Sequence, residues 1–188
     1  MTIGAIVLAA GLARRMGRSK LDLLLDGKPV LAHVLERLAD AGLPVIVVTG
    51  GHADAVRQVA GAATIVHAPE YAEGLGASLR SGIAAVPPGW TGVLVVLGDM
   101  PHVKPDTFRT LAAALESGKP AVVPVQDGRW GNPAGFARMH FATLATLVGD
   151  AGARAVLRRI GPAEILVQDA GVHRDIDCMS DLAGEASQ

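Results

Sequence analysis

The feature that most constrains the fold of this chain is the alternation of short apolar runs with amphipathic helical patterns. Five runs rich in β-branched residues predict strands, over residues 3–9, 44–49, 63–67, 92–98 and 121–125. In the second and fourth runs, apolar residues occupy consecutive positions (VIVV and VLVVL). Strands of this kind are buried on both faces of a sheet, so helices must cover both faces.

Helices are predicted between these runs. Leu31, Val34, Leu35 and Leu38 recur with helical spacing, with Pro29 suited to the first turn of this helix and Gly42 to its end. Two more helices are expected, from near Pro105 to Gly118 and from an N-cap at Asp150 to Gly161. Strands that alternate with helices predict an α/β fold, a three-layer α/β/α sandwich around a mainly parallel sheet.

The domain organisation is predicted to be simple, because 188 residues suit one domain. Residues 126–141 interrupt the alternation with a turn-rich segment, but residues 134–137 are expected to return to the sheet as a strand. We therefore predict a single domain over residues 1–188, with a frayed polar tail after about Leu182.

Composition excludes several classes of function. A net charge of −1 and an aromatic content of 3% argue against a nucleic-acid-binding protein. Cys178 is the only cysteine, which rules out an internal disulfide and a cysteine-based zinc site. No apolar stretch approaches the roughly 18 residues of a membrane span. The single cysteine and the lack of a membrane span predict a cytoplasmic enzyme. The six histidines form no HExxH pair and are interpreted as surface or turn residues rather than metal ligands.

The loop after the first predicted strand is cationic. Within LAAGLARRMGRSK, residues 8–20, four basic residues occur without an acid, namely Arg14, Arg15, Arg18 and Lys20. Gly11 and Gly17 allow tight turns that expose backbone N–H groups, while Arg15 and Lys20 can donate to phosphate oxygens. The spacing fits neither a Walker loop nor the dinucleotide fingerprint. The segment predicts an anion-binding loop, with a solvated basic loop as the alternative.

Asp99 follows the fourth predicted strand in the segment GDMP. In open α/β sheets, ligands bind beyond the carboxyl ends of the strands, where both this residue and the basic loop are expected. A carboxylate there can hold Mg²⁺, which shares its oxygen ligands with substrate phosphates. A turn aspartate that accepts bonds from neighbouring N–H groups is the alternative. The combination of loop and acid favours a nucleoside triphosphate with its metal.

The motifs LAAGLARRMGRSK, DGKPVL, GASLRSG, GDMP, GNPAGF, GDAGAR and DID occur in this order from residue 8 to about residue 177. Together they resemble the nucleotidyltransferases of the molybdenum cofactor pathway, especially the molybdenum cofactor cytidylyltransferases. The resemblance implies a Rossmann-like fold of the nucleotide-diphospho-sugar transferase type. It also implies transfer of CMP from CTP to the phosphate of molybdenum-molybdopterin, with release of pyrophosphate.

The resemblance assigns residues on the nucleotide side of the reaction. It places the base against the backbone of Leu8, Ala9, Ala10 and Gly11, and the triphosphate against Arg15 and Lys20. It makes Asp99 a Mg²⁺ ligand and Asp177 a second metal carboxylate, for which an ordinary turn or capping acid is the alternative. Catalysis by Lys20, Arg15 and Asp99 then amounts to alignment and charge neutralisation, without a protein nucleophile.

Further assignments by resemblance concern the base, the ribose and the acceptor. Ser78 and Arg80 are expected near the base and ribose, with helix packing and a solvated Arg80 as the alternative. Gly131, Asn132 and Pro133 are expected at the acceptor, although relatives often carry His where Asn132 stands. Residues 149–154 could present helix N–H groups to the acceptor phosphate, unless Asp150 is only a cap.

The choice of nucleotide depends on few residues. Guanylyl relatives typically have Gly at the position of Ala10 and an acid at the position of Ser19, so CTP is favoured and GTP is the alternative. A sugar 1-phosphate acceptor is a more distant possibility, and a noncatalytic nucleotide-binding cofactor chaperone is the alternative outside enzymes. The expected partners are the nucleotide, molybdopterin and a client molybdoenzyme or chaperone, with no membrane or nucleic acid. A monomer is expected.

Overall fold

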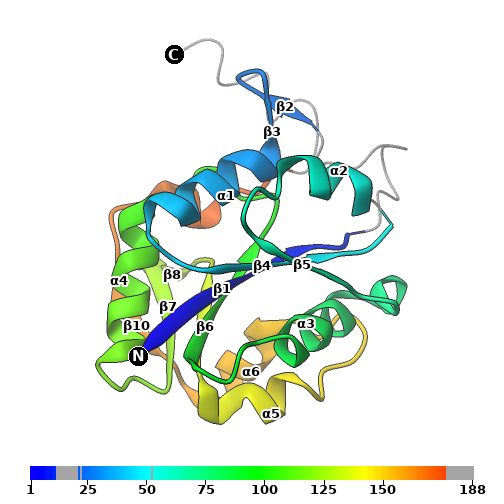
Figure 1. Ribbon diagram of the computed structural model, residues 1–188. Helices are drawn as coiled ribbons and strands as arrows, with labels where there is room; N and C mark the ends of the chain where they lie inside the picture. Colours follow the sequence, from blue (N-terminus) through cyan, green and yellow to red (C-terminus); the bar gives the residue numbers. More distant parts are fainter. Residues whose placement is uncertain (12–20, 22, 52, 177–188) are drawn as a thin grey trace.

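The computed structural model describes residues 1–11, 21, 23–51 and 53–176, and its centre is a twisted sheet (Figure 1). Eight strands form this sheet within the described residues. They are β1 (Thr2–Ala9), β4 (Val45–Thr49), β5 (Thr64–His67), β6 (Trp90–Leu97), β7 (Ala121–Gln126), β8 (Arg129–Trp130), β9 (Ala134–Ala137) and β10 (Ala163–Leu166). All five predicted strands are confirmed, and residues 134–137 do return to the sheet.

The sheet is mainly parallel, as predicted. Its order is β10-β7-β9-β6-β1-β4-β5, and β8 pairs with β7. Strand β9 is antiparallel to both β6 and β7, while β1, β4, β5 and β6 pair in parallel, as do β7 and β10. The carboxyl ends of the parallel strands therefore lie at the same edge of the sheet as the amino end of β9. A separate small hairpin contains β2 (Leu24–Leu25) and β3 (Lys28–Pro29).

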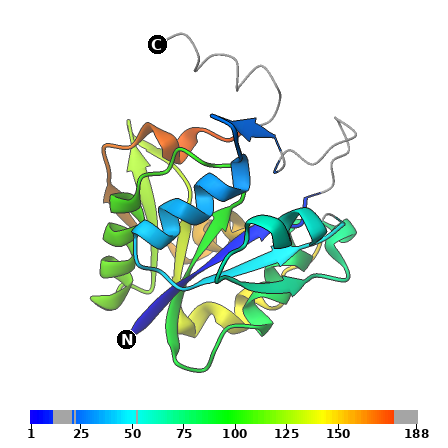
Figure 2. The same ribbon diagram turned by 45° about the horizontal axis from the view of Figure 1, so that its top comes forward.

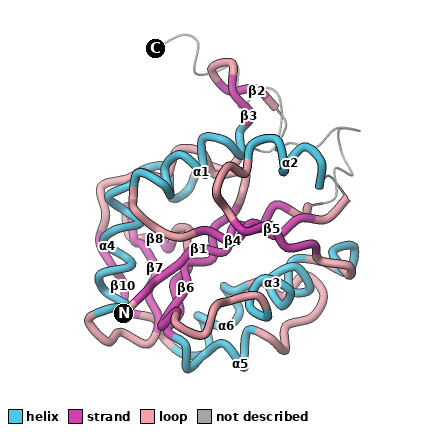
Figure 3. The backbone as a smooth tube through the Cα atoms, viewed as in Figure 1, coloured by secondary structure: helices cyan, strands magenta, loops and turns pink. Residues whose placement is uncertain are grey.

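Helices cover both faces of the sheet (Figures 2 and 3). The side chains of β1 explain this arrangement, because Ala5 and Val7 belong to one buried cluster and Ile6 and Leu8 to the other. The first cluster includes residues of α1 (Val30–Asp40), α2 (Ala53–Val59) and α4 (Pro105–Glu116). The second includes residues of α3 (Leu75–Ala84), α5 (Phe141–Leu144) and α6 (Ala153–Ile160). The three-layer α/β/α sandwich is confirmed.

Two helix starts differ from the sequence prediction. Pro29 is the N-cap of α1, one position before the first turn. The N-cap of α6 is Gly152, so the predicted cap at Asp150 is wrong. The physical reason is that the turn before α6 is bonded to another helix. Gly149 has a φ of +58°, and its carbonyl accepts a 2.9 Å bond from the amide of Gly76 at the start of α3.

None of the helices in the described ranges is both long and apolar enough to span a bilayer.

Candidate functional site

The two loops singled out in the sequence meet at the carboxyl edge of the sheet. The amide of Gly98, directly after β6, donates a 3.1 Å bond to the carbonyl of Leu8 on β1. A Cβ atom at Gly98 would lie 3.1 Å from the same carbonyl oxygen, so glycine permits this approach. Asp99 comes next and is half-buried. The structure thus places the predicted metal ligand beside the start of the predicted nucleotide loop.

The end of β1 offers backbone rather than side chains. Leu8, Ala9 and Ala10 are 7%, 3% and 4% exposed, and their side chains belong to the two buried clusters. Gly11 is exposed. A nucleotide at this point would therefore contact main-chain groups and Gly11, in keeping with a loop whose glycine exposes its amide.

The residue after β4, Gly50, packs against the backbone that follows β1. A Cβ atom at Gly50 would lie 2.8 Å from the carbonyl oxygen of Ala10 and 2.6 Å from the ring of Tyr71. Glycine is required there because the ring of Tyr71 and the turn after β1 leave no room for a side chain.

Three of the predicted site residues, Arg15, Lys20 and Asp177, lie outside the described residues. Their assigned roles stay predictions.

The α3 segment is tied into the fold. Ser78 is 3% exposed, consistent with helix packing. The Arg80 guanidinium pairs with the carboxylate of Glu70 and donates a 3.1 Å bond to the carbonyl of Leu147. Arg80 is therefore held by protein groups rather than solvated, contrary to the alternative weighed above. Contacts of Ser78 and Arg80 with a nucleotide stay predictions.

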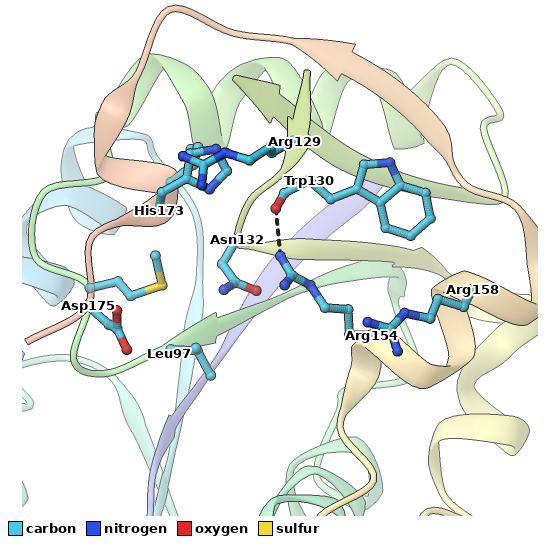
Figure 4. Close-up of a pocket in the computed structure, with 10 residues that line it drawn as sticks. Leu97, Arg129, Trp130, Asn132, Arg154, Arg158, His173 and Asp175 are labelled. Carbon is cyan, nitrogen blue, oxygen red and sulfur yellow. Dashed lines mark hydrogen bonds between the residues drawn. The ribbon is translucent and has the colours of Figure 1, made fainter. Parts of the chain in front are cut away.

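A cavity of about 660 Å³ opens at the same edge, on the side of β6 away from β4 (Figure 4). Leu97 and Met100, which flank Asp99 closely in sequence, form part of its wall. The other lining residues come from the β8 segment, from α6 and from the chain after β10: Arg129, Trp130, Asn132, Arg154, Arg158, Val172, His173 and Asp175. Among the described lining residues, three arginines against one aspartate give a positive charge, which suits an anionic ligand.

The segment between β8 and β9 is fixed by its backbone. The Gly131 amide donates to Pro124 O (2.8 Å), and the Asn132 amide donates to Val172 O (2.9 Å). Arg154 donates to the carbonyl of Trp130 (2.7 Å), the bond drawn in Figure 4. Pro133 follows through a cis peptide bond and begins the turn into β9. These bonds fix the segment that carries Asn132, whose side chain lines the pocket, and its role at the acceptor stays a prediction.

Asp169 anchors the chain that follows β10. It is 2% exposed, and its carboxylate accepts bonds from the Lys104 amide (2.8 Å), the Thr107 hydroxyl (2.6 Å) and the Gly171 amide (3.0 Å). The 3₁₀ helix η4 (Ala170–His173) starts from this anchor.

Beyond η4, the chain passes Asp99. The amide of Ile176 donates a 2.8 Å bond to the Asp99 carbonyl, and the preceding Asp175 is exposed at the pocket. His173 lies against the carbonyl of Gln126 at 3.2 Å. Asp99 and Asp175 thus lie on two chain segments that are joined by a backbone hydrogen bond at this edge.

The donor set is compatible with Mg²⁺ that arrives with a nucleotide. Within the described ranges, no group of three His, Cys, Asp or Glu side chains could form a metal cage. Mg²⁺ commonly needs only one or two protein carboxylates, because water and substrate phosphates complete its shell. Asp99, with Asp175 nearby, fits this mode of binding.

Sequence reasoning missed several pocket residues. Arg129 and Trp130 directly precede the predicted acceptor segment, and Asp175 lies two positions before Asp177. Arg154 and Arg158 are four residues apart and so share a helix face, a spacing that indicates a local basic patch. His173 carries no comparable local signal, since only the fold brings it to the pocket.

The model of the MobA-like NTP transferase domain matches residues 5–165 of this chain. The molybdenum cofactor guanylyltransferase of Rhizobium leguminosarum bv. trifolii is 36% identical over 135 residues, which are 68% of this chain and 59% of that protein. The molybdenum cofactor cytidylyltransferase of Escherichia coli K12 is 30% identical over 134 residues, 70% of this chain and 68% of that protein. The match thus spans about three fifths of the length of the Rhizobium relative.

The fold is also found in solved structures. Rv0371c from Mycobacterium tuberculosis H37Rv has 33% identity and a TM-score of 0.85, with 97% of this chain and 96% of that chain covered. The structure of its complex with manganese gives 30% identity and a TM-score of 0.84, covering 98% and 97%. These similarities confirm the fold expected from the sequence.

Proposed function

This chain belongs to the MobA-like NTP transferase domain family, and on that premise we propose that it transfers a nucleoside monophosphate to the phosphate of molybdopterin. The donor is a nucleoside triphosphate, and the second product is pyrophosphate. The names of the Rhizobium and Escherichia coli relatives support both the reaction type and the acceptor.

The observation that carries the proposal is the pair of sites at one edge of the sheet. The ends of β1 and β6, with Asp99, form the nucleotide side, and the arginine-lined pocket forms the acceptor side. Leu97 and Met100 line the pocket on either side of Asp99 in the sequence. An acceptor phosphate held by the arginines would therefore approach a nucleotide at Asp99 without crossing the sheet.

The chemistry needs alignment more than a protein nucleophile. An oxygen of the acceptor phosphate forms a bond to the α-phosphorus as the bond from that phosphorus to the β-phosphate bridge breaks, and the electron pair leaves with pyrophosphate. Arg154 and Arg158 would hold the acceptor phosphate, and the proposed roles of Arg15 and Lys20 are to neutralise the triphosphate. Mg²⁺ held by Asp99 would supply further charge neutralisation when bound. The manganese complex of Rv0371c supports a divalent ion.

CTP is the proposed donor and GTP is the alternative. Two positions favour CTP, Ala10 and Ser19, and Ser19 lies outside the described residues. The Ala10 side chain is 4% exposed and packs in the cluster on the α3 side. Its methyl group would therefore act by shaping the turn after β1 rather than by touching the base. The relatives include one named as a guanylyltransferase and one named as a cytidylyltransferase, so their names favour neither nucleotide.

A pyrophosphate-release assay tests the proposal. The full chain is incubated with Mg²⁺ and molybdopterin, with or without molybdenum, and with CTP, GTP, ATP or UTP in separate reactions. Release that needs molybdopterin and is fastest with CTP is expected. Release with a hexose 1-phosphate instead would indicate a sugar-phosphate nucleotidyltransferase, and nucleotide binding without turnover on any acceptor would indicate a nucleotide-binding chaperone.

A further inference from the structure

The Trp130 indole is held from two directions. It is half-buried, lines the pocket, and its Nε1–H donates a 2.6 Å bond to Oε1 of Glu164 on β10. Its backbone carbonyl accepts the 2.7 Å bond from Arg154. Both the ring and the main chain of Trp130 are therefore anchored before any ligand arrives.

The pocket combines flat groups with positive charge. In Figure 4 the indole lies on the same side of the pocket as the guanidinium groups of Arg154 and Arg158. An indole ring stacks well on another planar conjugated ring, while guanidinium groups bind phosphate through paired N–H donors. Such a wall offers a stacking surface and phosphate donors together, and so suits a planar ring that carries a phosphate.

We propose that Trp130 determines acceptor specificity by stacking on a planar heterocycle, and that Glu164 is the positioning residue that fixes the indole for this contact. The proposal rests on the proposed function for the position of the acceptor. It adds a residue that recognises the ring of the acceptor, where the arginines recognise its phosphate.

Matched variants distinguish the effect of the Trp130 ring from that of its hydrogen bond to Glu164. Trp130→Leu removes the stacking surface and is expected to raise the KM for molybdopterin about tenfold, the ratio that corresponds to roughly 1.4 kcal/mol. Glu164→Ala frees the indole and is expected to raise the same KM about threefold, by analogy with the loss of one ordinary hydrogen bond. Glu164→Gln keeps an oxygen that can accept the hydrogen bond from the indole, and its KM for molybdopterin is expected to equal that of the wild type. The KM for the nucleotide and kcat should change less than twofold in all three.

Tryptophan fluorescence gives a direct reading of binding. The chain has two tryptophans. Trp90 stands at the opposite end of β6, is 8% exposed and lies against Gly4, roughly 20 Å from the pocket by strand rise. Emission in a Trp90→Phe protein therefore reports on Trp130. If that variant is unstable, the difference in emission between the wild type and Trp130→Phe gives the same information.

The titration uses a pterin monophosphate, a hexose 1-phosphate and inorganic phosphate. A saturable change with the pterin compound, at concentrations where the other two have no effect, supports stacking. No change with the pterin compound, or an equal change with inorganic phosphate, overturns it. Turnover with molybdopterin but an unchanged KM in Trp130→Leu would overturn this proposal alone. Pterin binding at Trp130 without turnover by the wild-type protein would overturn the proposed function alone.

Discussion

We predict that replacing Asp169 lowers both the stability of the fold and the affinity of the acceptor pocket. Its buried carboxylate accepts bonds from Lys104 N, Thr107 Oγ1 and Gly171 N at distances of 2.6–3.0 Å. The Asp169→Ala change leaves all three donors without this acceptor. A hydrogen bond to a charged group contributes about 1.5–3 kcal/mol, and such values are not additive. We therefore expect the free energy of unfolding to fall by about 3–5 kcal/mol.

The functional effect should be confined to the acceptor side. Asp169 fixes the start of η4, and this segment supplies the carbonyl of Val172 that accepts from the Asn132 amide. The KM for molybdopterin should therefore rise at a temperature where the variant remains folded, while the KM for the nucleotide stays within twofold of the wild type.

Urea denaturation and initial rates measure both effects. Asp106→Ala is the matched control, because Asp106 precedes Thr107 on α4, its side chain is 88% exposed, and its ion pair is with Arg109 on the same helix. It should cost less than about 1 kcal/mol. In a protein of this size, the loss at Asp169 corresponds to a fall in Tm of roughly 6–20 °C. Equal stability of the two variants would refute the role given to Asp169.

Two other predictions concern the nucleotide side and the acceptor segment. Asp99→Asn and Lys20→Ala should each lower kcat by about 100-fold or more, with an unchanged urea midpoint, because each removes charge stabilisation of the reacting phosphates; a variant that keeps most of its turnover would contradict the assigned role. Gly131→Ala should destabilise the protein by about 1–3 kcal/mol, since its Cβ would lie 2.5 Å from the Val172 side chain. Gly89→Ala, with no atom within 4 Å of its Cβ, should have little effect by denaturation, and equal losses for the two changes would show that the close approach is unimportant.

The architecture was predictable because its central strands are apolar at consecutive positions. β4 and β6 belong to this class, and the sequence also marks the helices that cover them. β10 was missed because it is an edge strand whose residues alternate between half-buried and exposed, so its pattern resembles that of a surface loop. The cap at Asp150 was misplaced because the turn at Gly149 is bonded to α3, a partner far away in the sequence.

The candidate site was predictable only where its residues follow a strand or belong to a family motif. Asp99 and Asn132 satisfy that condition, and both lie at the carboxyl edge. Trp130 and His173 do not, because the pocket forms only when β9 inserts between β6 and β7 and η4 is anchored by Asp169. Their positions depend on tertiary contacts that no local pattern encodes.

The central claim is that the edge beside Asp99 joins a nucleotide to a phosphate held in the arginine pocket. The most direct measurement is the transfer of label from [α-³²P]CTP to the pterin, with the products separated by chromatography and the pyrophosphate counted in parallel. The account predicts one labelled nucleotide on each pterin product for each pyrophosphate released. Release of pyrophosphate with all of the transferred label found in free CMP, and none on the pterin, would contradict it.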